Sequence, residues 1–152
     1  PQLIEELPAD PSTMDLAEAD RIVGGGAGLG SPAAFDEMRQ LAMKLGASPG
    51  GTRVVTDWGW LPVERQIGTT GVAVDPSLYI AIGISGAVQH TAGLGSPTHI
   101  ISVNTDPHCP MMAMADLAIV CDGPEFLRQL LKRLESQPES TAADTAGSAE
   151  DS

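Results

Sequence analysis

The stretch Leu78–His90, LYIAIGISGAVQH, holds the residues whose types and spacing are most suited to chemistry. It opens on an apolar run typical of a buried strand, breaks at Gly83, and passes through Ser85 into a short helical pattern that ends on His90. A strand, a glycine turn and a helix start place backbone N–H groups and the positive end of a helix dipole in front of an anion. The stretch therefore predicts a site that faces an anionic ligand.

Ser85 is the candidate nucleophile of this stretch, but its surroundings favour another use. The segment 83–87, GISGA, falls one glycine short of the GxSxG elbow of serine hydrolases. A hydrolase would also need a general base oriented by an acid, and no such pair is identifiable in the sequence. We therefore interpret the Ser85 hydroxyl as a donor to a ligand or as the cap of the following helix, two roles that are compatible.

A second glycine-rich run, residues 24–30, follows a short predicted strand at 21–23. Five of its seven residues are glycine, which is typical of a tight turn or of a backbone that approaches a ligand. The run contains no GxGxxG in any register and no P-loop ending in lysine, so ATP hydrolysis is unsupported. On the residues alone, a plain strand-to-helix turn and a ligand-binding loop remain open.

Arg53 stands in an otherwise apolar run and is one of only eight Lys and Arg residues. A cation in such a run needs a partner, which is either a ligand or Asp57 in a salt bridge. His99 and His108 belong to no motif, and the neighbouring His108 and Cys109 are too little for a metal site. The sequence therefore predicts no metal centre.

The expected elements alternate along the chain. Extended segments are expected at residues 21–23, 52–55, 72–74, 78–82, 98–103 and 117–120, and helices at 32–45, 87–93, 110–115 and 123–134. Strands alternating with helices predict an α/β fold, a Rossmann-like parallel sheet with helices on both faces. Because parallel strands end at one edge of the sheet, the glycine turns, Asn104 and Asp122 should converge there.

The negative charge lies mainly at the two ends of the chain. The formal net charge is −12, residues 1–20 hold six acids and no Lys or Arg, and residues 136–152 hold four acids. We predict a linker or flexible acidic arm at 1–19, one domain at 20–135 and a disordered acidic tail at 136–152. The acidity argues against nucleic acid as a partner, because its binding is driven by phosphate neutralisation.

The sequence also bears on the compartment. No apolar run approaches the ~20 residues of a membrane span, and no signal peptide is visible. The two cysteines form no CxxC and are too few for a disulfide framework, which fits a reducing compartment.

The long motif LYIAIGISGAVQHTAG, followed by IISVNTD, resembles the C-terminal FAD-binding domain of electron transfer flavoprotein alpha subunits, with Ser102 where alanine is usual. The resemblance covers about residues 14–135. It implies a DHS-like NAD/FAD-binding domain, FAD as the cofactor, and an electron carrier, not an enzyme with a substrate of its own. Alpha subunits of this family carry another domain before this one, so the chain resembles an excised C-terminal half or a natural fragment.

The resemblance also implies how residues of this chain meet the flavin. Arg53 would lie against the ring and favour negative charge on it, the Thr70 hydroxyl would approach the N5 side, and His90 would donate to the O2 atom. Asn104 and Asp122 would hold the adenosine half. The full set of implied FAD contacts is Gly26, Gly28, Thr52, Arg53, Gln66, Gly68, Thr69, Thr70, Gly83, Ser85, Gly86, Gln89, His90, Asn104 and Asp122.

Three further positions depart from the family pattern and keep a second interpretation open. Ala27 replaces an arginine, Thr69 a glutamine and Thr105 a lysine. A degenerate nucleotide-binding module that serves assembly without redox-active FAD is therefore an alternative. A different Rossmann-like enzyme using NAD(P) is a further rival, against which the missing GxGxxG and the lack of an acid shortly after the first helix both count.

The resemblance implies partners and a compartment as well. Family members pair with an electron transfer flavoprotein beta subunit, accept electrons from flavin dehydrogenases of the acyl-CoA type, and pass them to a quinone oxidoreductase or another respiratory acceptor. The expected location is the cytoplasm of a bacterium or the mitochondrial matrix of a eukaryote.

Overall fold

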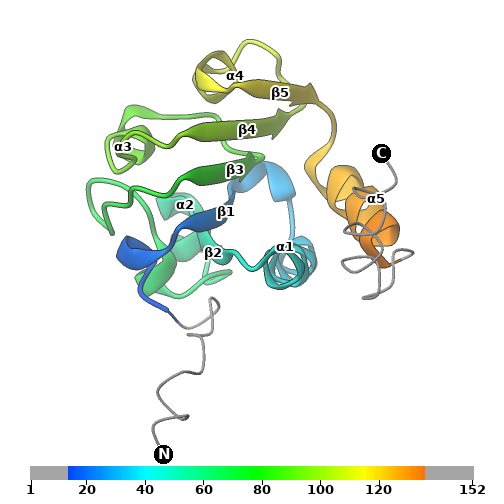
Figure 1. Ribbon diagram of the computed structural model, residues 1–152, viewed down its shortest axis with the longest axis horizontal. Coiled ribbons are helices and arrows are strands. Elements are labelled where there is room, and N and C mark those ends of the chain that lie inside the picture. The colour runs from blue at the N-terminus through cyan, green and yellow to red at the C-terminus, as the bar shows by residue number, and fades with distance from the viewer. Residues whose placement is uncertain (1–13, 136–152) are drawn as a thin grey trace, which may run out of the picture.

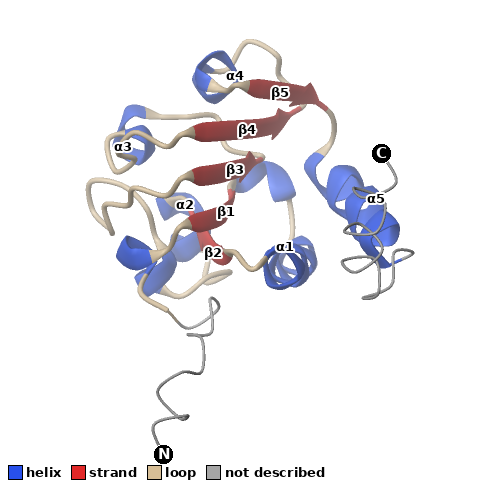
Figure 2. Ribbon diagram, viewed as in Figure 1, coloured by secondary structure: helices blue, strands red, loops and turns tan. Residues whose placement is uncertain are grey.

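The computed structural model describes residues 14–135, so residues 1–13 of the predicted arm and the predicted tail at 136–152 lie outside the described residues. Five parallel strands form one sheet in the order β2-β1-β3-β4-β5 (Figure 2). The strands are β1 Arg21–Gly25, β2 Ser48–Gly51, β3 Leu78–Ile82, β4 His99–Asn104 and β5 Leu117–Val120. The predicted Rossmann-like parallel sheet is confirmed.

Helices cover both faces of this sheet, as predicted. The α-helices are α1 Pro32–Leu45, α2 Arg53–Asp57, α3 Val88–Thr91, α4 Pro110–Met114 and α5 Gly123–Glu135, and the 3₁₀ turns are η2 Leu16–Glu18, η3 Ala27–Leu29 and η4 Val63–Arg65. Figure 1 shows α1 and α5 on one side of the sheet and α3 on the other. Within residues 14–135, none of these helices has the length and apolar character that crossing a membrane requires.

Alternate side chains of the strands enter two separate cores. Ile80 and Ile82 of β3 pack in one core with Leu127 of α5, whereas Tyr79 and Ile100 belong to the core on the opposite face. Burial on both faces is typical of parallel sheets and explains the continuous apolar run of β3. The strand ends, and not the faces, are therefore the part of the sheet that can meet a ligand.

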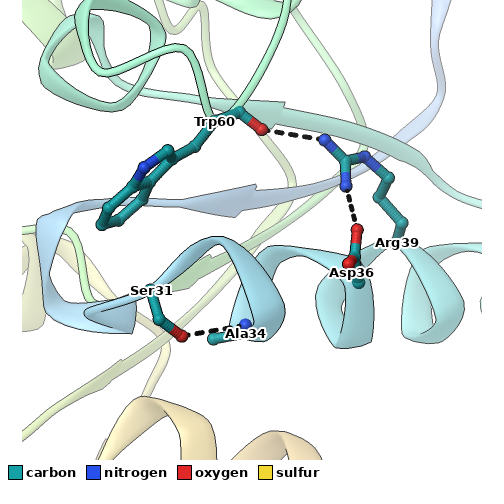
Figure 3. Close-up of polar contacts among 5 residues, drawn as sticks. All are labelled: Ser31, Ala34, Asp36, Arg39 and Trp60. Atoms are coloured by element: carbon teal, nitrogen blue, oxygen red, sulfur yellow. Dashed lines mark hydrogen bonds and ion pairs between the residues drawn. The ribbon is translucent and has the colours of Figure 1, made fainter.

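Helix α1 is fixed at its start, its end and its side. The Ser31 hydroxyl accepts a hydrogen bond from the N–H of Ala34 at 3.2 Å, and Gly46 ends the helix in the left-handed conformation. Arg39 pairs with Asp36 at 2.7 Å and donates at 2.8 Å to the backbone oxygen of Trp60 (Figure 3). Arg39 thereby ties α1 to the loop that leads from α2 toward the strand ends.

The predicted strand at 52–55 is wrong. The second strand is β2, which ends at Gly51, immediately before the predicted segment. The Thr-Arg-Val-Val run instead enters α2, which places Val55 in the core. A Cβ on Gly51 of β2 would lie 2.7 Å from the Leu61 side chain, so close tertiary packing requires a glycine in this strand. Local strand propensity could not reveal a strand of sequence SPGG.

Two other segments also differ from expectation. The extended piece expected at 72–74 forms only isolated bridges, Ile67 with Val72 and Val74 with Leu94. The described end of the predicted arm packs into the core through η2, where Leu16 is 2% exposed.

Gly24 of β1 leaves room for the hydroxyl of Tyr79, which a Cβ at this position would overlap. We predict that Gly24→Ala lowers the free energy of unfolding by ~1–3 kcal/mol through overpacking. Tyr79→Phe in the same background should return part of that loss, because it removes the oxygen nearest to the new methyl group. Equilibrium urea unfolding of the two single variants, the double variant and the unchanged chain measures this coupling; simple addition of the single effects would contradict it.

Candidate functional site

A pocket opens at the point where the strand order of the sheet reverses. The chain leaves β1 toward β2 on one side, and β3 lies on the other side of β1, which makes the β1–β3 edge a topological switch point. The pocket measures about 610 Å³, within the usual range of small-molecule and cofactor sites. It is lined by Gly26, Ala27, Gly28, Thr52, Arg53, Val54, Asp57, Gln66, Ile67, Gly68, Thr70, Gly83, Ile84, Ser85, Gly86, Ala87, Gln89, His90 and Asn104.

All of the residues that the resemblance implied as FAD contacts line this pocket, with two exceptions. Thr69 is exposed, and its backbone N–H donates to the Gln89 oxygen at 2.9 Å. Asp122 caps α5, where its carboxylate accepts from the N–H of Glu125 at 3.1 Å. The structure thus gathers residues from five separate segments at one edge and leaves Thr69 and Asp122 outside it.

The glycine run after β1 packs directly on the turn after β3. The N–H of Gly28 donates to the Gly83 oxygen at 3.0 Å, and a Cβ on Gly28 would lie 2.8 Å from the Gly83 Cα atom. A Cβ on Gly26 would lie 2.5 Å from the Gly83 oxygen. These glycines are therefore required for the contact between the two loops, and this contact forms the floor of the pocket.

Three side chains form a hydrogen-bonded row that ends at the pocket. The Thr56 hydroxyl lies 2.6 Å from Gln66 Oε1, and Gln66 Nε2 donates to Thr70 Oγ1 at 2.7 Å. Gln66 is 6% exposed, whereas Thr70 is exposed at the pocket wall. Thr56 was not predicted as part of the site, because it follows the segment that was expected as a strand at 52–55 and lies ten residues from Gln66.

Arg53 and Asp57 lie beside each other on α2, and both line the pocket. Their nearest charged atoms are 3.5 Å apart, and their side chains are 66% and 62% exposed. An exposed pair of this kind contributes only ~0–1 kcal/mol, so it does not hold Arg53 away from a ligand. Next to Arg53, the buried Thr52 hydroxyl has no hydrogen-bond partner among the described residues. An unpaired buried hydroxyl beside an exposed cation suits an oxygen-rich ligand.

His90 is buried at the pocket wall with both ring nitrogens engaged. Nε2 lies 2.6 Å from the Tyr79 hydroxyl and Nδ1 lies 3.2 Å from the Ile67 oxygen. A carbonyl oxygen only accepts, so Nδ1 carries the proton and Nε2 accepts from Tyr79. Burial lowers the pKa of His90 from 6.5 to about 4, although the bond to Ile67 opposes the shift. The imidazole is therefore neutral at pH 7.

This geometry bears on the predicted donation from His90 to a flavin oxygen, which stays a prediction. Donation to a flavin oxygen requires an N–H that points into the pocket, and the single N–H of the neutral ring is directed to Ile67. Burial also raises the pKa of Tyr79 above its usual value, so the phenol keeps its proton and donates it to the ring.

A metal centre has no support in the described part of the chain. Between residues 14 and 135, no cluster of three or more His, Cys, Asp or Glu side chains could hold an ion.

The sheet and its switch-point pocket define a Rossmann-like α/β domain. Residues 15–95, more than half of the chain, match the family described as the electron transfer flavoprotein FAD-binding domain. The chain belongs to this family.

Relatives from plants and bacteria are similar to most of this chain. The mitochondrial electron transfer flavoprotein subunit alpha of Oryza sativa subsp. indica is 47% identical over 125 residues, which are 82% of this chain and 35% of the relative. Protein FixB of Bradyrhizobium diazoefficiens is 45% identical over 135 residues, 88% of this chain and 37% of the relative. The electron transfer flavoprotein subunit alpha of Syntrophomonas wolfei is 41% identical over 129 residues, 85% of this chain and 41% of the relative. The chain therefore spans little more than a third of the length of these relatives.

The depressed pKa of His90 makes stability depend on pH. The unfolded chain binds a proton at this residue near pH 6.5 and the folded chain only near pH 4. The contribution of neutral His90 to the free energy of unfolding is therefore complete above pH 6.5 and is lost as the pH falls toward 4. We expect His90 to account for a loss of roughly 3 kcal/mol over this window.

The measurement is the free energy of unfolding in urea at several pH values between 7 and 4. His90→Gln should remove this part of the slope, whereas the matched substitution at the exposed His99, His99→Gln, should keep it. Equal slopes for the two variants would show that His90 takes up its proton in the folded state at an ordinary pH.

Proposed function

We propose that this chain is the FAD-binding part of an electron transfer flavoprotein alpha subunit, and that it carries electrons without turning over a substrate of its own. The observation that carries the proposal is the position of the pocket: it lies at the switch point, and its lining contains thirteen of the fifteen residues that the resemblance implies as FAD contacts. A bound FAD would supply reversible acceptance and release of electrons.

The groups in the pocket suit the parts of FAD. The N–H groups of Ser85 and Ala87 take part in no hydrogen bond within the described residues, so they are available to an anion such as a pyrophosphate. The unpartnered Thr52 hydroxyl and the exposed Ser85 hydroxyl suit the ribityl chain or the phosphates. Ile67, Ile84 and Val54 add apolar wall against which a flat ring can pack.

The side chains around the ring position have distinct tasks in this proposal. Arg53 is the one Lys or Arg among the residues lining the pocket, so it would favour negative charge on the ring. Thr70 would donate a hydrogen bond. Neutral His90 would hold the wall in place through Tyr79 and Ile67 and would contribute no charge.

Partners and location follow from the family and belong to the proposal. The electron transfer flavoprotein beta subunit would cover the open side of the pocket. Flavin dehydrogenases of the acyl-CoA type would supply electrons, and a quinone oxidoreductase or another respiratory acceptor would remove them. The compartment would be the bacterial cytoplasm or the mitochondrial matrix.

One observation favours the alternative of an assembly module that binds adenine nucleotides weakly. Ala27 lines the pocket where the family has an arginine, and Thr105 stands where it has a lysine, so the pocket has fewer cations for a pyrophosphate. Asp122 caps α5 and does not reach the pocket.

The test is a visible absorption spectrum of the chain after loading with FAD and desalting, alone and together with a beta subunit. We expect flavin absorbance at a stoichiometry near one FAD per chain, and far weaker binding of AMP. Equal affinity for AMP and FAD would favour the assembly module. A colourless protein under both conditions would contradict the FAD proposal.

Arg53→Ala should lower the reduction potential of the bound FAD. Loss of a positive charge beside the ring would cost the reduced form about the Coulomb energy of two unit charges ~4 Å apart in water, ~1 kcal/mol or about 40 mV for one electron. Arg53→Lys keeps the charge and should shift the potential less. Asp57→Asn removes the neighbouring negative charge and should shift the potential upward.

Spectroelectrochemical titration of the flavin-loaded assemblies measures all three variants. An unchanged potential in Arg53→Ala, or shifts of the same sign in Arg53→Ala and Asp57→Asn, would show that the charge of Arg53 does not act on the flavin ring.

A further inference from the structure

Thr56 lies outside the pocket but begins the hydrogen-bonded row that enters it. Its side chain is on the inner face of α2 and is 9% exposed. Its hydroxyl oxygen lies 2.6 Å from Gln66 Oε1 and 2.9 Å from the Arg53 backbone oxygen. At the other end of the glutamine, Nε2 lies 2.7 Å from Thr70 Oγ1.

The direction of donation in this row is set at Thr56, because a hydroxyl has one proton to give. When Thr56 donates to Gln66 Oε1, the amide presents its NH₂ to Thr70. The Thr70 oxygen then accepts, and its own proton remains for the pocket. The shorter of the two distances at Thr56, 2.6 Å against 2.9 Å, is the one to Gln66.

The reverse arrangement gives the pocket a different surface. If Thr56 donated to the Arg53 oxygen, it could only accept from the glutamine, and the amide of Gln66 would turn round. Thr70 would then donate its hydroxyl proton to Gln66 Oε1 and could only accept a hydrogen bond from a ligand. The two arrangements occupy the same space, so shape does not decide between them.

We propose that Thr56 is a positioning residue that makes Thr70 a hydrogen-bond donor toward the pocket. The ligand group it selects is an acceptor, such as a ring nitrogen or carbonyl oxygen of a flavin, and this part of the inference rests on the proposed FAD function. Because Gln66 is buried and bonded at both ends, the donor is oriented before the ligand arrives.

The first test needs no ligand. Thr56→Val keeps the shape of the side chain and removes the hydroxyl, whereas Thr56→Ser keeps the hydroxyl. In the NMR spectrum of the FAD-free chain, the Gln66 side-chain amide protons should exchange slowly in the unchanged chain and in Thr56→Ser, and markedly faster in Thr56→Val. Equal exchange in all three would overturn the proposal, whatever the pocket binds.

The second test uses FAD, with a beta subunit present if the chain alone does not retain it. Thr56→Val should weaken FAD binding roughly three- to tenfold and shift the visible bands of the bound flavin, since one hydrogen bond to the ring is lost. Thr56→Ser should restore both. Thr70→Val should give a similar loss, and the double variant Thr56→Val/Thr70→Val should lose no more than Thr70→Val alone.

The outcomes separate the two proposals. If the unchanged chain binds no FAD, the proposed function fails, and the amide exchange still tests whether Thr56 holds the Gln66 side chain in place. If FAD binds normally to Thr56→Val, or if the losses at Thr56 and Thr70 add, Thr56 does not act through Thr70. Urea unfolding of each variant without ligand shows whether a loss of binding is a loss of folded protein.

Discussion

The pocket depends on one buried contact, in which the His90 ring joins the Tyr79 hydroxyl of β3 to the Ile67 backbone oxygen. These groups belong to a strand, to α3 and to the turn at 66–71, three segments with no regular strand pairing between them. Gly24 in the neighbouring strand leaves the space that the Tyr79 hydroxyl occupies. A missing side chain in β1 therefore permits the bond that places two walls of the pocket.

Near the same contact, α3 and the 66–71 turn lie so close together that glycines are required between them. The Thr69 N–H donates to the Gln89 oxygen, and a Cβ on Gly68 would lie 2.5 Å from that oxygen. A Cβ on Gly93 would lie 2.6 Å from the Cα atom of Gly68. The glycines of the turn thus serve backbone packing, and the turn in turn presents Gln66 and Thr70 to the pocket. Close backbone packing of this kind orients the two side chains before a ligand binds.

Much of the sheet was predictable because its central strands are apolar and buried on both faces. The apolar run of β3 and the stripe of α1 are local patterns, and both elements lie where the sequence placed them. Strand β2 could not be found in this way, because its sequence SPGG has little strand propensity and owes its form to neighbours such as Leu61. The mistake carried over to the site: with residues 52–55 in a strand, Thr56 had no predicted contact with Gln66.

The pocket residues themselves were predictable from the family pattern, but their hydrogen bonds were not. His90 lies eleven residues from Tyr79 and twenty-three from Ile67 in sequence, so no local motif shows that its nitrogens are already used. A pattern identifies which residue types meet at a strand edge; it does not say which protons remain for a ligand. In this chain the N–H of His90 donates to the Ile67 backbone oxygen. The row from Thr56 through Gln66, in contrast, leaves the hydroxyl proton of Thr70 for a ligand. The chemistry of the pocket thus depends also on Thr56 and Tyr79, which do not line it, because each is hydrogen-bonded to a residue that does, Gln66 or His90.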